Sequence, residues 1–391
     1  MKKLKIAIIA HCCRTGGGLS MTLNLLRAMN DIAQDEQFLL IYSSGYGYEN
    51  IKLSPGSESF FYKGSHSPPA RYLFEKFKLP RLIKNYNPDA IFSASNVGLP
   101  SISVPQAVLI GQPHLLYDKK HYPQIHLRLQ LRIEALKIQT RKFLPSTDII
   151  YAQIPVVKRR FAERYNYPEN QIKVLPLPTP AEIKPVEGIE APALFDKSAD
   201  NFYILMMTRY MAHRNPGILI PLCKRYADQL RDKKIKFITT VEREDDILVD
   251  KFLKNISRYH LEDIITNVGS LSRQEVVQYF SHSQAFWMPT TMETLGLPFL
   301  ESMTMGVPIL APDLDFARYV CGEAALFYDP WDIDSMFNSV ISIRTEESLR
   351  QKLIAKGKEE IANSERFASN WEEPAAQIIQ DLRFLVTGDK I

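Results

Sequence analysis

Short continuous apolar runs, separated by longer amphipathic stretches, make up the pattern of this 391-residue chain. The run Lys5–Cys12 does not alternate with polar residues, which is typical of a parallel strand buried on both faces. The triple glycine Gly16, Gly17 and Gly18 follows as a turn, and the apolar spacing after it predicts a helix over Ser20–Met29. Strand, glycine turn and helix is the usual opening of a doubly wound α/β domain.

Further strands and helices are predicted along the whole chain. In the first half, apolar runs predict strands at residues 38–42, 90–94, 107–110 and 149–152. A second series follows at residues 202–208, 235–240, 264–268, 285–288, 308–311 and 324–328. Helical patterns fill most of the gaps, for instance at residues 216–230, 273–280 and 333–341. Each series therefore predicts a parallel sheet with right-handed crossovers.

A proline-rich stretch separates the two series. It holds Pro176, Pro178, Pro180, Pro185 and Pro192, a density that resists helix and sheet and marks a linker. We therefore predict an acceptor-side domain over residues 1–190 and a donor domain over residues 191–368, with a closing helix over 369–391 that crosses back to the first domain. Two doubly wound domains of this kind are expected to face each other across a cleft at the carboxyl ends of their strands.

Composition and charge narrow the class of protein. Hydrophobic residues make up 45% and charged residues 24%, as in ordinary globular proteins. Residues 1–150 hold 19 Lys and Arg against 10 Asp and Glu, so the first half is expected to meet something anionic: phosphates, a membrane surface or nucleic acid. No recognisable nucleic-acid module accompanies this charge. The four cysteines form no Cys-x-x-Cys pair, which gives zinc and thioredoxin-like chemistry no support and fits a reduced cytoplasmic protein.

Two segments are relevant to contact with a membrane, and one of them is a candidate. The charged amino terminus precedes an apolar run that Arg14 and the glycines interrupt, so we expect neither a signal peptide nor a membrane-spanning helix. Residues 121–143 are basic and apolar; period-two alternation over 125–133 indicates a strand, whereas length and Leu/Arg/Gln content favour a helix. Such a helix is either simply solvated or touches anionic lipid, which would make the protein peripheral to the inner face of the plasma membrane.

Two glutamates surround a predicted anion site. Pro298 suits the first turn of a helix and Gly306 the position after its end, so a helix is predicted over 298–305, preceded by a tight turn at Gly296. Free N–H groups at such a helix start bind anions. Glu293 lies before this helix and Glu301 one turn into it, an arrangement suited to a diphosphate with hydroxyl-rich sugars at both ends.

This segment resembles a known signature. Glu293 and Glu301, within the stretch from Pro289 to Asp313, resemble the Glu-x7-Glu motif of the family 4 retaining glycosyltransferases, which have the GT-B fold. The resemblance implies that Glu293 contacts the donor sugar and Glu301 the ribose. It also implies that the amides of Thr294, Leu295 and Gly296 hold the diphosphate.

Three other segments are similar to the same family. The stretch 205–215 resembles a motif in which an Arg and, five residues later, a Lys clasp the diphosphate; these positions are Arg209 and Arg214 here, so Arg replaces Lys. Ser270 and Leu271 resemble the loop that frames the nucleotide base. The three glycines at 16–18 match the glycine-rich first loop, where the donor comes close to the backbone.

The acceptor side resembles the family less. The family carries a His at the end of an apolar strand, for which His114 is the candidate, with Gln112 as the alternative. The expected catalytic residues are therefore Glu293, Arg209, Arg214 and His114. Electrostatic stabilisation of the leaving diphosphate by the arginines would make a metal unnecessary, so no metal or cofactor is expected. Asp313-Leu-Asp315 is interpreted as a loop and helix cap rather than a metal motif.

The expected activity is transfer of a sugar, with retention of configuration, from a nucleotide diphosphate sugar to a saccharide or lipid-linked saccharide. We expect the donor to be a UDP-sugar rather than a GDP-sugar. We also expect the product to belong to a surface polysaccharide or a glycolipid. A nucleotide-sugar epimerase or a non-catalytic nucleotide-sugar binder remains an alternative. A nicotinamide-dependent dehydrogenase is disfavoured because the glycines lack Gly-x-Gly-x-x-Gly spacing.

Overall fold

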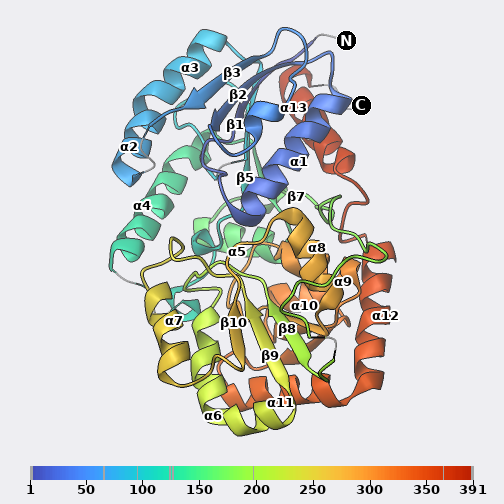
Figure 1. The fold of residues 1–391 in the computed structure, drawn as a ribbon. Coiled ribbons are helices and arrows are strands. Elements are labelled where there is room, and N and C mark those ends of the chain that lie inside the picture. The colour runs from blue at the N-terminus through green and yellow to red at the C-terminus, as the bar shows by residue number, and fades with distance from the viewer. Residues whose placement is uncertain are drawn as a thin grey trace. The chain divides into compact units, whose positions relative to one another are not determined.

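The computed structural model describes residues 3–64, 67–94, 96–122, 125, 127–196, 198–363 and 365–388. The chain forms two compact α/β units (Figure 1). The first unit consists of residues 1–118, 125–178 and 367–391, and the second of residues 119–124 and 179–366. Each unit therefore combines segments that are distant in the sequence.

A parallel sheet of seven strands, in the order β3-β2-β1-β4-β5-β6-β7, forms the centre of the first unit. Its strands are β1 (Lys5–Ile9), β2 (Gln37–Ser43), β3 (Glu58–Tyr62), β4 (Ala90–Ser93), β5 (Gln106–Ile110), β6 (Ile149–Ala152) and β7 (Ile172–Val174). The central strands are buried along almost their whole length, which explains their uninterrupted apolar sequences. The strand order reverses between β1 and β4, and ligands bind beside such a reversal in open α/β sheets.

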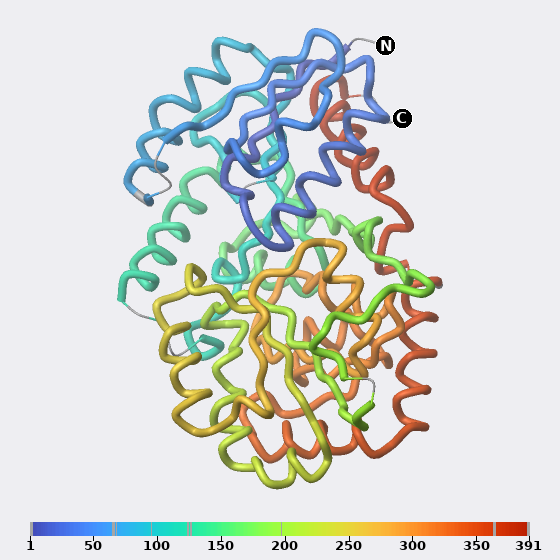
Figure 2. The backbone as a smooth tube through the Cα atoms, in the orientation of Figure 1, coloured from blue at the N-terminus to red at the C-terminus, as the bar shows by residue number. Residues whose placement is uncertain are grey.

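The helices of the first unit pack on both sides of this sheet. They are α1 (Gly16–Ile32), α2 (Pro68–Leu73), the π-helical turn η2 (Phe74–Lys78), α3 (Leu79–Tyr86), α4 (Leu127–Phe143), α5 (Pro155–Tyr165) and α13 (Glu372–Thr387). The carboxyl-terminal helix α13 packs along α1 and reaches β4 (Figure 2). Buried Asp381 on α13 accepts a hydrogen bond from Tyr151 Oη (2.7 Å) and pairs with Lys173 (2.6 Å), so this helix is fixed to β6 and β7.

The second unit contains a parallel sheet of six strands in the order β10-β9-β8-β11-β12-β13. The strands are β8 (Phe202–Met206), β9 (Ile235–Thr239), β10 (Ile265–Asn267), β11 (Ala285–Trp287), β12 (Ile309–Pro312) and β13 (Ala325–Tyr328). Helices α6 (Leu219–Asp232), α7 (Val249–Arg258), α8 (Arg273–His282), α9 (Leu297–Met305), α10 (Asp315–Cys321), α11 (Ile333–Thr345) and α12 (Glu347–Asn363) complete it. The order reverses between β8 and β11, so the expected ligand edge lies at their carboxyl ends.

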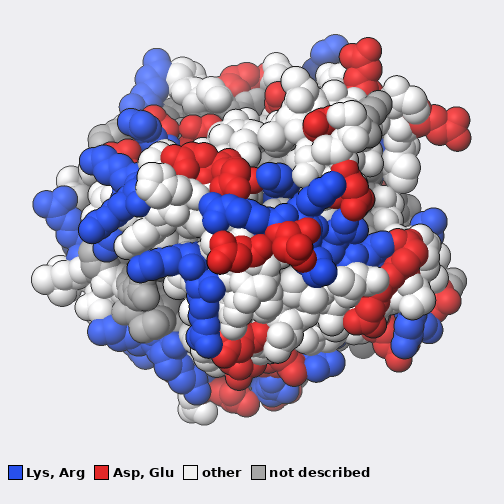
Figure 3. All heavy atoms as spheres, turned by 60° about the horizontal axis from the view of Figure 1, so that its bottom comes forward, with Lys and Arg blue, Asp and Glu red and all other residues white. Residues whose placement is uncertain are grey.

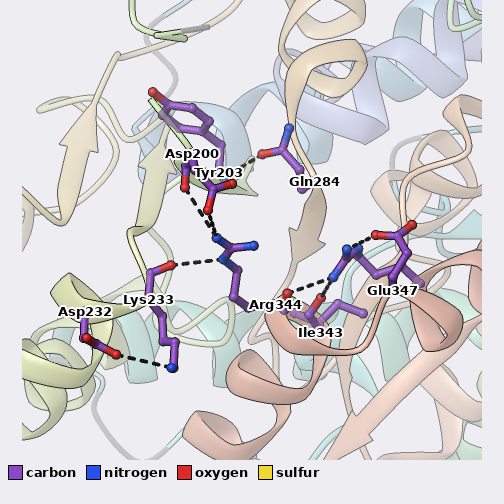
Figure 4. Close-up of polar contacts among 9 residues, drawn as sticks. Asp200, Tyr203, Asp232, Lys233, Gln284, Ile343, Arg344 and Glu347 are labelled. Carbon is purple, nitrogen blue, oxygen red and sulfur yellow. Dashed lines mark hydrogen bonds and ion pairs between the residues drawn. The ribbon is translucent and has the colours of Figure 1, made fainter. Parts of the chain in front are cut away.

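Polar contacts fix the opposite, amino-terminal edge of this second sheet (Figure 4). Arg344, at the end of α11, donates to Lys233 O (3.0 Å) before β9 and to Asp200 Oδ2 (2.6 Å) before β8. Figure 3 brings the α6 and α11 end of Figure 1 forward, and there Lys and Arg are interspersed with Asp and Glu. This face therefore offers no single-sign patch for a polyanion.

The structure confirms the predicted doubly wound α/β class, and every strand predicted from the sequence is present. Two edge strands, β3 and β7, were not predicted. The helix after the first strand was predicted too short, because Gly16–Gly18 form its first turn instead of a separate turn before it.

The boundary between the units also lies earlier than predicted, after Pro178 instead of residue 190. Residues 179–190 belong to the second unit because contacts fix them there. The hydroxyl groups of Thr179 and Thr304 are 3.0 Å apart, and His282 Nε2 lies 3.1 Å from Ile189 O. Residues 367–391, including α13, belong to the first unit.

Within the described residues, none of the helices combines the length and apolarity required to cross a bilayer.

Candidate functional site

The predicted donor residues gather at the carboxyl ends of β8 and β11, where the strand order of the second sheet reverses. The loop after β8 carries Arg209 and Arg214, and the loop after β11 carries Glu293. His213 O joins the two loops, since it accepts hydrogen bonds from Thr291 N (2.7 Å) and from Thr290 Oγ1 (3.1 Å). The two predicted motifs, 80 residues apart in the chain, thus form one site.

Glu293 and Arg214 form an ion pair inside this site. Arg214 Nε lies 3.3 Å from Glu293 Oε1, and the two side chains are 19% and 7% exposed. Thr290 Oγ1 donates to the same carboxylate oxygen (3.4 Å). Burial raises the pKa of Glu293, and Arg214 and Thr290 offset only part of this increase. Glu293 is thus a buried carboxyl group in contact with a cation and a hydroxyl group at the carboxyl end of β11.

Glu301 forms an ion pair with a different arginine, Arg273. It is buried on α9, and Arg273 Nη1 at the start of α8 donates to its Oε1 (3.3 Å). Burial raises the pKa of Glu301 as well, and Arg273 and Arg214 oppose this increase. Arg214 therefore acts electrostatically on both glutamates, which places the three groups in one site.

Gly296 shapes the start of α9. Its backbone is left-handed (φ 79°, ψ 60°), a conformation that glycine adopts without steric cost. Among the described residues, no hydrogen-bond partner is found for the amides of Leu295 and Gly296. Two amides at a helix start, next to the Arg214 guanidinium, form an arrangement suited to a phosphate group.

Gly296→Ala is expected to lower the free energy of unfolding by about 1–3 kcal/mol, because a Cβ strains this backbone and would lie 2.9 Å from Phe299 Cδ2. Urea unfolding measures the loss. Gly188→Ala is the matched control: Gly188 also has a positive φ of 68°, but a Cβ there meets nothing within 4 Å. Equal losses in the two variants would contradict the predicted collision.

Arg209 is held by Asp245, a residue that the sequence did not indicate. Arg209 Nε donates to Asp245 Oδ1 (2.5 Å), and Asp245 Oδ2 accepts from Tyr210 N (2.8 Å) and Glu242 N (3.1 Å). The Arg209 side chain remains 40% exposed. Asp245 therefore orients this guanidinium at the strand end while leaving much of it accessible.

The loop predicted to frame the base follows β10. Ser270 N donates to Glu242 Oε1 (2.5 Å), which fixes the loop, and Gly269 before it has a positive φ of 76°. Leu271 is followed by Ser272, which caps α8 through reciprocal hydrogen bonds with Glu275. This cap directs Arg273 toward Glu301. The conformation of the loop thus positions one partner of the site.

The Asp313-Leu-Asp315 segment is occupied by local contacts. Asp313 pairs with Arg318 through two hydrogen bonds (2.6 and 2.8 Å), and Asp315 Oδ1 accepts from Phe316 N at the start of α10. Leu314, and not an aspartate, holds the cap position of α10. Both aspartates therefore have structural partners in this loop and helix start.

The remaining predicted residues lie in the first unit. Gly16, Gly17 and Gly18 form the first turn of α1, and Gly16 has a positive φ of 61°. A Cβ at Gly16 or Gly18 would meet nothing within 4 Å, so the first unit itself leaves open space around both positions.

His114 lies after β5, at the same carboxyl-terminal edge as Cys12 and Cys13. It is 2% exposed, and its Nδ1 lies 3.1 Å from Gln112 Nε2, the residue that was its alternative. Asn96 Oδ1 accepts from Gln112 N (2.9 Å), which fixes the turn before His114. Burial, and then Lys137 and Arg132, lower the pKa of His114 to about 4. His114 is therefore neutral at physiological pH.

This depressed pKa predicts a loss of stability in acid. Between pH 6.5 and about 4 the unfolded chain binds a proton at His114 that the folded chain does not bind, so stability falls as the pH falls through this window. The loss amounts to about 3 kcal/mol. Urea unfolding from pH 7 to pH 4 should show a shallower pH dependence for His114→Gln than for the wild type. Parallel curves would contradict the prediction.

A separate cavity of about 480 Å³ lies at the opposite edge of the first sheet. Thr147 and Gln171, which precede β6 and β7, line it together with Arg141, Arg164 and Tyr165. Because ligands of doubly wound sheets bind at the carboxyl edge, we do not assign this cavity to the site.

Part of the second unit matches a known protein family. Residues 192–360 match the family model described as Glycosyl transferases group 1. The O-antigen chain mannosyltransferase B of Escherichia coli is 28% identical over 142 residues, which cover 36% of this chain and 35% of that protein. The match thus spans about a third of the length of this curated relative.

Solved structures are similar over nearly the whole chain. WaaG, a glycosyltransferase involved in lipopolysaccharide biosynthesis, has a TM-score of 0.74 at 13% identity, covering 99% of this chain and all of that chain. Anabaena HepE in complex with UDP-glucose has a TM-score of 0.69 at 14% identity, covering 97% of this chain and all of that chain. At these identities the similarity establishes the fold, which is GT-B.

Proposed function

We propose that this chain, whose residues 192–360 belong to the glycosyl transferases group 1, transfers a sugar from a nucleotide diphosphate donor to a hydroxyl group of a saccharide or lipid-linked saccharide. The observation that carries the proposal is the buried Glu293–Arg214 pair beside the start of α9. Glu301 lies one turn into this helix and pairs with Arg273. The cations and the amides suit the diphosphate of the donor. The two carboxylates suit the sugars on either side of the diphosphate, one carboxylate for each sugar.

The chemistry follows from where charge develops. As the bond between the sugar and the diphosphate breaks, negative charge grows on the leaving phosphate oxygen. We propose that Arg209, Arg214 and the amides of residues 294–296 stabilise it, a contribution that is often the largest in catalysis. We propose retention of configuration from the family resemblance: the acceptor hydroxyl attacks the face from which the diphosphate leaves, and the departing phosphate oxygen takes its proton.

The relatives support a choice of substrates. Because a structural neighbour holds UDP-glucose, we propose a UDP-sugar as the first donor to test. The resemblance to an O-antigen mannosyltransferase and to a lipopolysaccharide glycosyltransferase supports an acceptor in surface polysaccharide or glycolipid assembly.

Thermal stabilisation by UDP, GDP, ADP and their sugars tests the donor half of the proposal. One of the nucleoside diphosphates is expected to raise the Tm, and its sugar is expected to be hydrolysed slowly without acceptor. An epimerase would instead convert the bound sugar to its epimer, and a non-catalytic binder would leave it unchanged. Absence of stabilisation by every nucleotide would overturn the proposal.

We also propose that the outer face of α4 contacts an anionic membrane, which would place the enzyme at the inner face of the plasma membrane. Leu127, Leu131 and Ile138 lie on one face of this helix and are 68%, 63% and 52% exposed. Arg141 and Lys142 are exposed in its last turn. An exposed apolar stripe flanked by cations is typical of helices that lie on anionic lipid.

Flotation with vesicles tests this surface. We expect the protein to float with anionic vesicles at low salt, to float less at high salt because the charges are screened, and to remain unbound to neutral vesicles. Leu131→Asp should abolish flotation. Ile247→Asp, in the second unit, serves as control because Ile247 is even more exposed (75%), and it should float like the wild type. Absence of binding to anionic vesicles at low salt would overturn the proposal.

A further inference from the structure

A second cluster of charged side chains lies in the first unit, outside the donor residues. It surrounds the carboxylate of Glu75, which is buried on the π-helical turn η2. Glu75 Oε1 lies 3.0 Å from His11 Nε2 and 3.0 Å from Arg71 Nε, and Oε2 accepts from Gln139 Nε2 on α4 (2.6 Å). Both oxygens of the Glu75 carboxylate are therefore already bound.

Two further arginines approach this cluster without a carboxylate of their own. Within the described part of the chain, neither Arg14, in the loop after β1, nor Arg132, on α4, has an ion-pair or hydrogen-bond partner. The pKa of Arg132 is lowered by burial and then by Arg71 and Arg14, so the three guanidinium groups interact with one another. Like charges held together in this way destabilise each other.

The balance of charge is therefore positive. Burial lowers the pKa of His11, but Cys12 and then Glu75 raise it to about 9. Three guanidinium groups (Arg14, Arg71 and Arg132) and the imidazole of His11 thus surround the carboxylate of Glu75. An anion entering this cluster would satisfy Arg14 and Arg132 and relieve their repulsion.

The location is that of a ligand site. His11 and Arg14 follow β1, beside the point where the strand order of the first sheet reverses. Arg71 and Glu75 reach it from α2 and η2, and π-helical turns are frequent at functional sites. The cluster is thus built by the loop after β1, by α2 and η2, and by α4, at the edge where doubly wound sheets bind ligands.

We propose that His11, Arg14, Arg71 and Arg132 bind an anionic group, phosphate or carboxylate, carried by the sugar acceptor. The inference rests on the proposed transferase activity and specifies its acceptor. The donor diphosphate already has Arg209, Arg214 and the start of α9 in the second unit, so these cations serve a second anion. Guanidinium groups bind phosphate and carboxylate groups through two parallel hydrogen bonds.

Arg132→Gln tests the proposal, because the hydrogen bonds and ion pairs of Glu75 are made by His11, Arg71 and Gln139, so the loss of Arg132 leaves them intact. The probes are hexose 6-phosphate against the free hexose, measured by isothermal titration. The wild type should bind only the phosphate, and Arg132→Gln should weaken this binding by about 10- to 100-fold. Lys142→Gln, about 15 Å further along the same helix, should bind the phosphate like the wild type.

Two additional measurements separate this inference from the transferase proposal and from lipid binding. Stabilisation by the preferred nucleoside diphosphate should be unchanged in Arg132→Gln, and that nucleotide should not displace the hexose phosphate. Displacement would overturn the inference, since the cluster would then bind the donor. Phosphatidic acid vesicles form the second arm: weaker vesicle binding by Arg132→Gln than by the wild type places the recognised phosphate on the lipid, while loss confined to hexose 6-phosphate places it on the sugar. Equal affinity of wild type and Arg132→Gln for both probes, or binding of neither probe, would overturn it.

Discussion

Arg214→Met is expected to lower kcat for sugar transfer by about 10²- to 10³-fold, because the leaving diphosphate loses a cation that is oriented before the reaction begins. The position of Arg214 supports this magnitude: its Nε lies 3.3 Å from Glu293 Oε1, and the side chain is only 19% exposed. Charges act most strongly where water is largely excluded. Steady-state kinetics with saturating donor measures the effect.

Arg214→Lys is the matched control. A lysine keeps the positive charge, and the related motif carries Lys at this position, so most of the activity should remain. Two outcomes would contradict the electrostatic role. Either Arg214→Met retains kcat and raises only KM, or Arg214→Lys is as inactive as Arg214→Met.

Glu293→Gln is expected to lower kcat/KM by about 10²-fold, since the amide keeps the volume of the side chain but cannot accept hydrogen bonds at both of its ends. Burial raises the pKa of Glu293, so its ionised form, which we propose binds the sugar hydroxyls, disappears as the pH falls through a value above the usual range of a glutamate. The wild type should therefore lose activity on the acid side, and this acid limb should be absent from the residual activity of Glu293→Gln.

A matched measurement separates catalysis from folding. Since a neutral side chain is tolerated better at this buried position than a charge, Glu293→Gln should unfold at nearly the same temperature as the wild type. A double-mutant cycle with Arg214→Met should show non-additive losses, because the two side chains form one ion pair. Additive losses, or an unchanged acid limb in Glu293→Gln, would contradict the assigned role.

The central strands could be predicted because burial on both faces leaves a continuous apolar sequence. β5, for example, is fully buried from Gln106 to Ile110. The edge strands lack this signal: β3 is largely exposed and β7 has only three residues, so neither differs clearly from a loop in sequence. The glycines at 16–18 were assigned to a turn because glycine is unfavourable inside helices, a preference that matters little in a first turn.

The site was predictable where its residues are close in sequence. Glu293, Gly296 and Glu301 lie within nine residues, so one helix start positions all three. Their partners come from elsewhere in the chain: Arg273 follows β10, and Asp245 follows β9. Periodicity gives no information about such pairings, although the capping box of Ser272 and Glu275 would have placed Arg273 in the first turn of a helix. The Glu75 cluster was missed for the same reason, since its members come from β1, η2 and α4.

The discontinuous composition of the two units has a consequence for protein engineering. The chain passes between the units four times, at 118/119, 124/125, 178/179 and 366/367. A donor unit exchanged with that of a relative must therefore include residues 119–124, where His121 O accepts a hydrogen bond from Thr291. It must also leave α13 with the recipient, because a chimaera cut once near residue 180 would replace the helix that covers α1 and β4. A single proteolytic cut in the proline-rich linker should therefore not separate the two units. The carboxyl-terminal fragment still carries α13, and this helix packs on α1 and β4 of the amino-terminal fragment.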